Sequence, residues 1–449
     1  MTYLVKYLVI FVLENRMISI IKTTLKLTLF TFFITACSSV VIKDKPQKTT
    51  PNIPSTTVSN CPNWKSGDTI KIKKDTVIPK GCSYQRVSFS LEKENIAFDC
   101  QGAVLNGLKQ NKPNSIFIAY SKASEPRNWA FSVYKSGINI KNCHIKNYID
   151  GIVIRFRVPK KQHELLRKKT NVVSIENQLR DDAPKNITIS NTKIHSSHKH
   201  GIYMQRYVSH IIFEQGEIKY SGNSAIYMES GTRHNEIRNS YFYKNGYTNY
   251  KRKKRMRMPK YPTGEREAIA VDSSAYNKII GNTFKNNGKG AVFLYKNCFE
   301  KHKNKAQLPR FQHSNYNQIK NNHFIDERYG VWLASRQSKQ LSRFKCGDPI
   351  MYKTRGLFGS EKYYHDYAKN NQVVNNTFKN ITEGIVVEDD NNMITNNKFS
   401  GSSNVDIMIG TPYRSKSKND PVKGIIIENN QRDTGELKLK FIGGSKEGA

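Results

Sequence analysis

The chain has 449 residues, and its 73 lysines and arginines outnumber its 36 aspartates and glutamates to give a formal net charge of +37. A surface this basic favours an acidic partner such as an anionic polysaccharide, nucleic acid or anionic lipid head groups. A general bias of the sequence toward lysine would give the same excess without such a partner. The length allows two or three ordinary domains, or one array of repeats.

The N-terminal segment is predicted to be a secretory signal, because a basic and then apolar run that begins at Met17 ends in small residues. The sequence ITAC at 34–37 resembles the lipobox of bacterial lipoproteins. This resemblance implies that residues 1–36 are removed, that Cys37 is lipidated, and that the two serines after it direct the protein to the outer membrane. The alternative, a transmembrane helix, is disfavoured because the apolar run is short.

Residues 37–60 are rich in proline, serine, threonine and lysine, and we expect a flexible tether there. Residues 61–94 are expected to form an N-terminal cap, 95–431 the main domain, and 432–449 a tail. Six cysteines remain besides Cys37, an even number that suits disulfides in an oxidising compartment. The expected pairs are Cys61–Cys82, Cys100–Cys143 and Cys298–Cys346. A zinc site is the alternative, but the sequence has no CxxC motif.

A six-residue phrase returns along the main domain, opening on Gly or Ala and then alternating apolar with variable residues. Alternation with a period of two predicts a β-strand with one face buried, and recurrence along the chain predicts stacked coils. The copies are GIVIRF at 151–156, GIYMQR at 201–206, AIYMES at 225–230, AIAVDS at 268–273, AVFLYK at 291–296, GVWLAS at 330–335 and GIVVED at 384–389.

A second phrase lies between these copies and holds two short strands around an asparagine-rich bend, as in YNKIIGNTFKNNG at 276–288. We expect a column of asparagines from successive bends to form an amide ladder: Asn239, Asn282, Asn322, Asn376 and Asn397. Three strands in a coil of 23 to 24 residues resemble the single-stranded right-handed parallel β-helix of the pectin-lyase-like superfamily. The resemblance covers 95–431, implies an all-β solenoid, and extends to polysaccharide lyases and C5-epimerases.

Four insertions interrupt the repeat, and each adjoins the first phrase: 157–185, 247–266, 297–315 and 336–369. Insertions on one face of a solenoid commonly build its binding face. Two of them carry basic runs, KKQHELLRKK at 160–169 and KRKKRMRMPK at 251–260. We expect these runs to attract an anionic polymer, and the alternative is that they are merely solvated loops.

The outward positions of the first phrase supply candidate binding residues. Tyr203, Tyr227 and Trp332 fall in one column and predict a flat aromatic platform for sugar rings, or a seal under the covering loops. Glu229 and Asp272 are expected one strand spacing apart. Such a pair can be the acid and nucleophile of a glycosidase, can bind calcium, or can be neutralised by a basic loop.

The residues around His200 suggest proton transfer on a uronic acid. We expect His200 or Tyr227 to act as base or acid, Arg206 and Arg233 to neutralise the carboxylate, and Lys296 to contact substrate. Lys199-His200-Gly201 resembles the GHG element of polygalacturonase-like hydrolases, but their other motifs are missing, as is the Asp-Pro-His motif of alginate C5-epimerases. No family's catalytic set can therefore be transferred.

The prediction is a monomeric lipoprotein that binds an anionic, uronate-containing polysaccharide and cleaves it by β-elimination. Secretion and the lipid anchor argue against nucleic acid as its ligand. The alternatives are a C5-epimerase, a glycoside hydrolase acting through Glu229 and Asp272, and a polysaccharide-binding lipoprotein without catalytic activity. The sequence predicts no metal ligand set, although calcium at the two carboxylates stays open.

Overall fold

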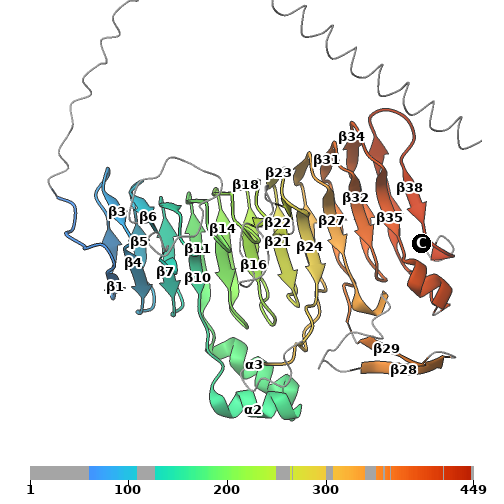
Figure 1. Cartoon of the computed structure of the whole chain (residues 1–449), viewed down its shortest axis with the longest axis horizontal. Helices are drawn as coiled ribbons and strands as arrows, with labels where there is room; N and C mark the ends of the chain where they lie inside the picture. Colours follow the sequence, from blue (N-terminus) through green and yellow to red (C-terminus); the bar gives the residue numbers. More distant parts are fainter. Residues whose placement is uncertain are drawn as a thin grey trace, which may run out of the picture. The chain divides into compact units, whose positions relative to one another are not determined.

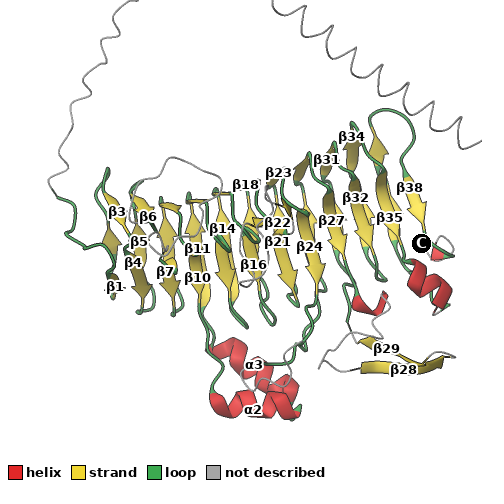
Figure 2. Cartoon of the chain, viewed as in Figure 1, coloured by secondary structure: helices red, strands yellow, loops and turns green. Residues whose placement is uncertain are grey.

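The computed structural model describes residues 60–108, 127–248, 263–264, 266–299, 307–338, 350–356, 359–364, 366–417 and 419–445. The predicted signal, Cys37 and the tether lie outside these ranges. Val58–Ala449 forms one compact unit. Its strands build three long sheets whose neighbours are parallel and come from successive coils (Figures 1 and 2). The predicted all-β, single-stranded, right-handed parallel β-helix is confirmed.

Sheet A contains every copy of the six-residue phrase. Its strands are β1 (Thr69–Ile72), β4 (Ser88–Leu91), β7 (Trp129–Val133), β10 (Asp150–Ile154), β13 (Ile202–Met204), β16 (Ile226–Met228), β21 (Glu267–Asp272), β24 (Gly290–Tyr295), β27 (Tyr329–Leu333), β32 (Glu383–Val387), β35 (Val405–Ile409) and β38 (Leu439–Phe441).

Sheets B and C contain the two short strands of the second phrase. Sheet B is β2 (Thr76–Val77), β5 (Ala97–Asp99), β8 (Asn139–Lys141), β11 (Lys185–Ser190), β14 (Ser209–Glu214), β17 (Glu236–Arg238), β22 (Lys278–Ile280), β25 (Gln318–Lys320), β30 (Gln372–Val374), β33 (Met393–Thr395) and β36 (Ile426–Glu428). Sheet C is β3 (Ser83–Gln85), β6 (Val104–Asn106), β9 (His144–Lys146), β12 (Lys193–His195), β15 (Glu217–Lys219), β18 (Tyr241–Tyr243), β23 (Thr283–Lys285), β26 (His323–Ile325), β31 (Thr377–Lys379), β34 (Lys398–Ser400) and β37 (Gln431–Arg432).

The solenoid extends beyond the expected boundaries at both ends. β1 pairs with β4, so the segment expected as a cap already contributes a complete first coil. At the other end β38, within the expected tail, pairs with β35. Short first strands with few apolar residues gave too weak a periodic signal to be recognised as a coil.

The core consists of inward side chains stacked in register from coil to coil. In sheet A, Ile202 pairs with Ile226 and Met204 with Met228, and all four side chains are fully buried. In sheet C, five phenylalanines stack with centroid distances of 4.7 to 5.1 Å: Phe242, Phe284, Phe324, Phe378 and Phe399. Each stacked pair adds about 0.5–1.5 kcal/mol to the burial of its rings.

The predicted amide ladder runs through the bend between sheets B and C. Asn282 donates its backbone N–H and its side-chain amide to Oδ1 of Asn322, at 2.9 and 3.1 Å. Asn322 repeats this pattern toward Asn376, and Asn376 toward Asn397. Every buried amide in the column is thereby satisfied, as a dry bend requires.

One predicted member of this ladder is wrong. Asn239 lies one residue earlier, in the left-handed conformation with φ 49°. The ladder position is held by Ser240, whose backbone N–H donates to Oδ1 of Asn282 at 3.0 Å. Each bend contains both an exposed left-handed residue and a buried ladder residue, and asparagine suits both, so the sequence alone misplaced the register by one.

Two further ladders occupy the other bends, and the sequence analysis missed them. One joins sheets A and B through Asn235, Asn277, Asn317, Asn371 and Asn392. The other joins sheets C and A and ends on a carboxyl group: Asn245 donates to Asn287, which donates to Glu327 at 2.7 Å. Complete burial raises the pKa of Glu327 well above its ordinary value, because an ionised carboxylate is costly in a dry bend.

The insertions form elements that the repeat pattern did not predict. Two helices, α2 (Lys160–Lys168) and α3 (Val172–Asp182), occupy the insertion at 157–185, and Leu166 and Leu179 are fully buried. The remaining elements of the described ranges are two short antiparallel pairs, a 3-10 helix and a π-helix: β19 (Tyr247–Thr248) with β20 (Thr263–Gly264), β28 (Ile350–Gly356) with β29 (Gly359–Tyr364), η2 (Arg336–Ser338) and η3 (Tyr413–Ser417). The basic run at 251–260 lies outside the described residues.

Two predicted disulfides are confirmed: Cys61–Cys82 beside the first coil and Cys100–Cys143 between successive coils. Cys298 is also disulfide-bonded, and its predicted partner Cys346 lies outside the described residues. Disulfides indicate an oxidising compartment outside the cytoplasm. Across the described ranges, the helices are too short or too polar to cross a membrane.

We predict that Asn322→Ala lowers the free energy of unfolding by about 2–4 kcal/mol, because it leaves buried amides without acceptors. Urea denaturation followed by circular dichroism measures the change. The matched control is Asn139→Ala, on the exposed face of β8, which should change it by less than about 0.5 kcal/mol. Equal effects of the two substitutions would contradict the structural role of the ladder.

The raised pKa of Glu327 predicts a pH-dependent loss of stability. The native state keeps the proton of Glu327 at pH values at which the unfolded chain has released it. The free energy of unfolding therefore falls as the pH rises above the ordinary pKa of glutamate. Glu327→Gln, neutral at every pH, should therefore gain stability relative to the wild type between about pH 5 and about pH 8. Urea denaturation at both pH values measures the effect. If the free energies of unfolding of Glu327→Gln and the wild type differ by the same amount at both, the pKa of Glu327 is not raised.

Candidate functional site

The candidate site lies on the outer face of sheet A, where two coils carry the same arrangement. Tyr203 on β13 pairs in register with Tyr227 on β16, and their rings meet edge to face at 5.7 Å. Each hydroxyl reaches a carboxylate of the following coil: Tyr203 donates to Glu229 Oε2 at 2.6 Å, and Tyr227 to Asp272 Oδ2 at 2.5 Å. The repeated strand therefore produces a repeated tyrosine–carboxylate pair.

Burial and the adjacent carboxylates both raise the pKa values of the two tyrosines. Burial, and then the adjacent Glu229, raise the pKa of Tyr203 well above its usual value. Burial and Asp272 raise the pKa of Tyr227 in the same way. Both phenols stay neutral in the physiological range, so either is suited to donate a proton and neither is suited to act as a resting base.

His200 lies against both tyrosines, with centroid distances of 5.3 Å to each ring. Its Nδ1 is 2.9 Å from Oδ1 of Asp150, which also accepts the backbone N–H of His200 at 3.1 Å. In the tautomer in which Nδ1–H donates to the carboxylate of Asp150, Nε2 carries no proton and is able to accept one. Nothing in the described part of the chain hydrogen-bonds Nε2.

The two carboxylates of the predicted pair are occupied. Asp272 is fully buried and accepts bonds from the backbone and side-chain amides of Asn297, both at 2.8 Å, besides the bond from Tyr227. Arg310 Nε lies 3.6 Å from Asp272 Oδ2. Glu229 accepts from Arg206 Nε at 3.0 Å in addition to Tyr203. Both groups therefore orient the tyrosines.

Inserted loops reach this face, as predicted. Arg206 donates to the backbone carbonyls of Leu308 and Pro309 in the insertion at 297–315. Arg167 on α2 donates to the carbonyl of Gln307 at 2.6 Å. Parts of two insertions thus meet beside the tyrosine–carboxylate pairs, and Arg206 is committed to Glu229 and to the loop.

The structure does not bring Arg233, Lys296 and Trp332 into this cluster. Arg233 lies in the turn toward sheet B, with its guanidinium 5.9 Å from the ring of Tyr276. Lys296 is buried and its charge acts on Asp366. Trp332 packs edge to face on Phe293 at 5.1 Å. Trp332 is in the same column as Tyr227 but three coils further along the axis, whereas Arg233 and Lys296 lie beyond the ends of their strands.

The predicted flat platform is not formed. Ala270 separates the two tyrosines from the aromatic group at Trp332, because it occupies the intervening coil of the same column. The rings of Tyr203 and Tyr227 meet edge to face at 69°, as do those of Phe293 and Trp332 at 79°, and outside the column Tyr329 stacks on Trp332 at 18°. The column therefore provides two small aromatic groups and no continuous surface for stacking sugars.

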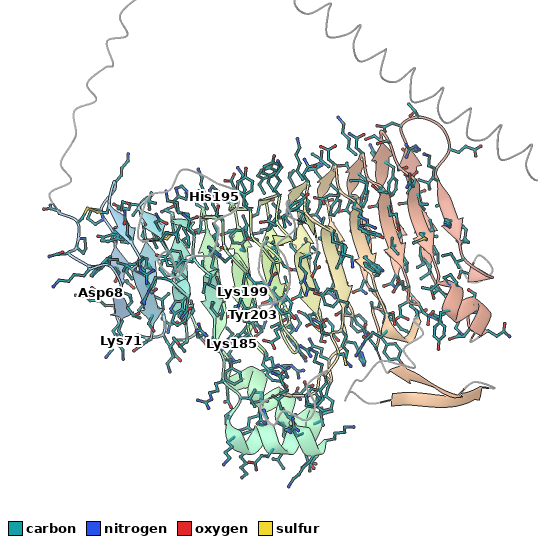
Figure 3. The ribbon with its side chains drawn as sticks, viewed as in Figure 1. Asp68, Lys71, Lys185, His195, Lys199 and Tyr203 are labelled. Atoms are coloured by element: carbon teal, nitrogen blue, oxygen red, sulfur yellow. A yellow bond between two sulfur atoms is a disulfide. The ribbon has the colours of Figure 1, made fainter. Side chains whose placement is uncertain are left out.

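Sequence reasoning missed Asp150, Asn297 and Lys199. Asp150 precedes the phrase by one residue and pairs with His200 across 50 residues, a separation that an inserted pair of helices causes. Asn297 follows the phrase AVFLYK directly. The side chain of Lys199 makes no ion pair with the residues described, and Figure 3 labels it together with Tyr203 on the central coils. In the sequence, the one sign that Asp150 belongs to the site was its position directly before a copy of the six-residue phrase.

The described ranges contain no group of three or more histidines, cysteines, aspartates and glutamates that could hold a metal ion. The carboxylates considered for calcium are bonded to tyrosine, asparagine and arginine donors instead. The donor set therefore does not fit a calcium site, which needs six to eight free oxygens.

Two family models match parts of the chain. Residues 180–346 match the right-handed β-helix region, and residues 303–436 match the periplasmic copper-binding protein NosD. Each covers less than half of the chain. No curated protein sequence matches it.

The fold is similar to that of solved β-helix structures at low identity. A tailspike protein variant of E. coli bacteriophage HK620, in complex with a pentasaccharide, is 11% identical with a TM-score of 0.48 over 84% of this chain and 57% of the tailspike. An alginate lyase from Paenibacillus sp. str. FPU-7 is 12% identical, with a TM-score of 0.39 over 85% and 93% of the two chains. A variant of the periplasmic alginate epimerase AlgG is 10% identical, with a TM-score of 0.46 over 84% and 76%. The chain thus spans little more than half of the tailspike.

Proposed function

We propose that this protein is an envelope lipoprotein that cleaves an anionic, uronate-containing polysaccharide by β-elimination. The observation that carries the proposal is the arrangement of His200 against Tyr203 and Tyr227, with its Nδ1 bonded to Asp150. A base and neutral phenolic acids are thereby held in van der Waals reach of one another. The formal charge of +37 supports an anionic substrate.

In the proposed reaction, Nε2 of His200 removes the proton from C5 of the uronate. The electron pair of that C–H bond forms the C4–C5 double bond, and the C4–O4 bond breaks. The leaving oxygen takes a proton from Tyr227, or from Tyr203 in the preceding coil. The raised phenol pKa makes this transfer harder, so it is coupled to the breaking of the C4–O4 bond, which places negative charge on the accepting oxygen.

The substrate carboxylate needs a positive charge to stabilise the carbanion-like transition state. Arg206 was expected in this role, but its guanidinium is already in an ion pair with Glu229. Lys199, which directly precedes His200 and has no ion-pair partner among the residues described, takes the role in this proposal. Arg206 then becomes a positioning residue that holds Glu229 against Tyr203.

Hydrolysis is the weaker alternative because Asp272 is fully buried and its oxygens are bonded to Tyr227 and Asn297. A glycosidase needs one of two carboxylates to attack the sugar or activate water. Epimerisation shares the proton abstraction and differs only in reprotonation at C5.

The proposal also includes a lipid anchor at Cys37 and an outer-membrane location. Both are supported by the resemblance of residues 34–37 to a lipobox.

Incubation of the purified protein with a panel of alginate, polygalacturonate and glucuronan should produce the absorbance of a C4–C5 double bond. His200→Ala should lower the rate at least about a hundredfold, and Tyr227→Phe about tenfold or more. Lys398→Ala, on the exposed edge of β34 in sheet C, is the matched control and should be fully active. New reducing ends without absorbance would replace elimination by hydrolysis, and full activity of His200→Ala would refute the assigned base.

Asp150→Asn should lower kcat by about a hundredfold or more, because an amide can donate to Nδ1 and so turn the imidazole to the tautomer that protonates Nε2. Asp150→Glu, which keeps an acceptor, should recover part of the rate. A purely structural role for Asp150 would instead lower the urea midpoint in both variants and leave kcat of the folded fraction unchanged.

A further inference from the structure

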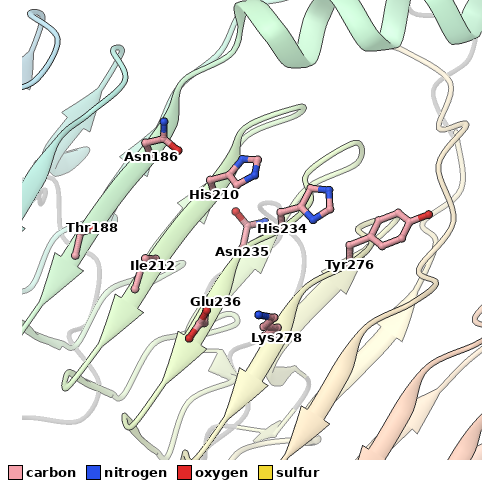
Figure 4. A pocket seen from close by; sticks show the side chains of 9 residues that line it. All are labelled: Asn186, Thr188, His210, Ile212, His234, Asn235, Glu236, Tyr276 and Lys278. Carbon is pink, nitrogen blue, oxygen red and sulfur yellow. The ribbon is translucent and has the colours of Figure 1, made fainter.

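A second surface lies on sheet B, away from the residues assigned to catalysis. A hollow with a volume of about 480 Å³ crosses several coils there (Figure 4). One of its sides is the turn that enters sheet B, and the other is the exposed face of the strands. The residues that line it are Asn186, Thr188, His210, Ile212, His234, Asn235, Glu236, Tyr276 and Lys278.

Stacked rings form part of the turn side of the hollow. His210, His234 and Tyr276 line it in successive coils, and Tyr316 continues the row one coil beyond the lining residues. The centroid distances along the row are 5.2, 5.2 and 5.0 Å, and the interplanar angles are 22°, 23° and 9°. Tyr276 and Tyr316 are 43% and 47% exposed, high values for such large side chains. Because the rings cover each other's faces, the row presents ring edges, with nitrogen and hydroxyl groups, to the solvent.

These rings occupy a backbone position that normally selects other residues. All four have φ between 54° and 59°, the left-handed region that tyrosine tolerates poorly. The same position holds asparagine or glycine in six other coils: Asn95, Gly137, Asn186, Asn370, Asn391 and Gly424. Histidine is common in this conformation, but the two tyrosines carry a conformational cost there, and four consecutive rings where six other coils hold asparagine or glycine indicate a use for the row.

The strand side of the hollow supplies polar and charged groups in register. Thr188, Ile212, Glu236 and Lys278 pair in order along β11, β14, β17 and β22. Glu236 is bound to Arg238 at 2.8 Å, whereas Lys278 is exposed and has no ion pair among the described residues. Arg233 stands over the ring of Tyr276 at 5.9 Å. Of the two charged residues that line the hollow, Glu236 is thus paired and Lys278 is not, and Arg233 adds a further positive charge beside the lining residue Tyr276.

We propose that this hollow is a second glycan-binding groove, in which an extended anionic polysaccharide chain lies parallel to the solenoid axis. Polar groups recur along the row with the coil spacing of ~4.8 Å, which is comparable with the advance of an extended glycan per sugar. The ring edges hydrogen-bond successive hydroxyls, and Lys278 and Arg233 attract the carboxylates. The anionic character of the glycan rests on the proposed function, whereas the groove itself does not.

The decisive substitution is Tyr276→Asn together with Tyr316→Asn, because asparagine is the residue that other coils place at this position. The double variant is expected to fold with an unchanged or higher urea midpoint and to bind long uronate oligosaccharides about tenfold more weakly in calorimetric titrations. Lys278→Glu should weaken binding similarly without touching the stack. The matched control is Lys398→Glu, the same charge change on sheet C, which should bind as the wild type does.

The full-length protein is titrated with oligomers of alginate and of polygalacturonate, and with a neutral glucan as comparator. Wild-type affinity in both the tyrosine double variant and Lys278→Glu would overturn the groove, as would a wild type that binds none of the oligomers. Groove-dependent binding without any elimination product would support the groove and contradict only the proposed reaction. A lower urea midpoint with unchanged affinity in the double variant would assign the stack to stability and overturn the proposal.

Discussion

The in-register stacking of coils is the constraint on which the rest of the structure depends. Each strand of a coil pairs with the same strand of the next, so a residue meets its counterpart at one strand spacing. Buried bends can stack at this spacing only if each of their polar groups finds a hydrogen-bond partner in the coil before or after it. The three amide ladders provide this, since each asparagine accepts from the coil before it and donates to the coil after it. Where a ladder ends on Glu327, burial keeps the carboxyl neutral.

Stacking also explains the form of both surfaces. A side chain on the outside of a coil lies directly beside its counterparts in the coils before and after it. The residues of both surfaces are therefore arranged in columns. On sheet A, Tyr203 and Tyr227 each reach the carboxylate one coil further on, and His200 packs across both. On sheet B, the ring row from His210 to Tyr316 continues through four coils. The tyrosines of the first column are held by the buried Asp272 and the partly buried Glu229, whereas Tyr276 and Tyr316 of the second are exposed.

The sequence predicted those features that repeat and failed where the repeat is interrupted. Period-two alternation placed Ile202 and Met204 inside and Tyr203 outside, as the structure shows. The ladder was predicted apart from Ser240, because serine and asparagine can satisfy the same bend. The helices α2 and α3 gave no extended periodic signal, so the contact between Asp150 and His200 across them could not be anticipated. Arg233 was assigned to the wrong face since a turn, unlike a strand, has no alternation from which to infer direction.

A polymeric ligand would explain why exposed rings and positive charge lie along the axis of the solenoid. A small molecule would need one closed cavity, whereas the stacked rings of sheet B extend along the axis and are exposed where an ordinary turn holds asparagine. The site on sheet A is the opposite case, because Arg206 is bound to the inserted loop at 297–315, Arg167 of α2 also holds that loop, and the tyrosines are largely buried. A long chain held by an open groove on one face could present single sugars to an enclosed site on the adjoining face. The same repeat would then supply both affinity, through many weak contacts along the axis, and chemistry, through one histidine.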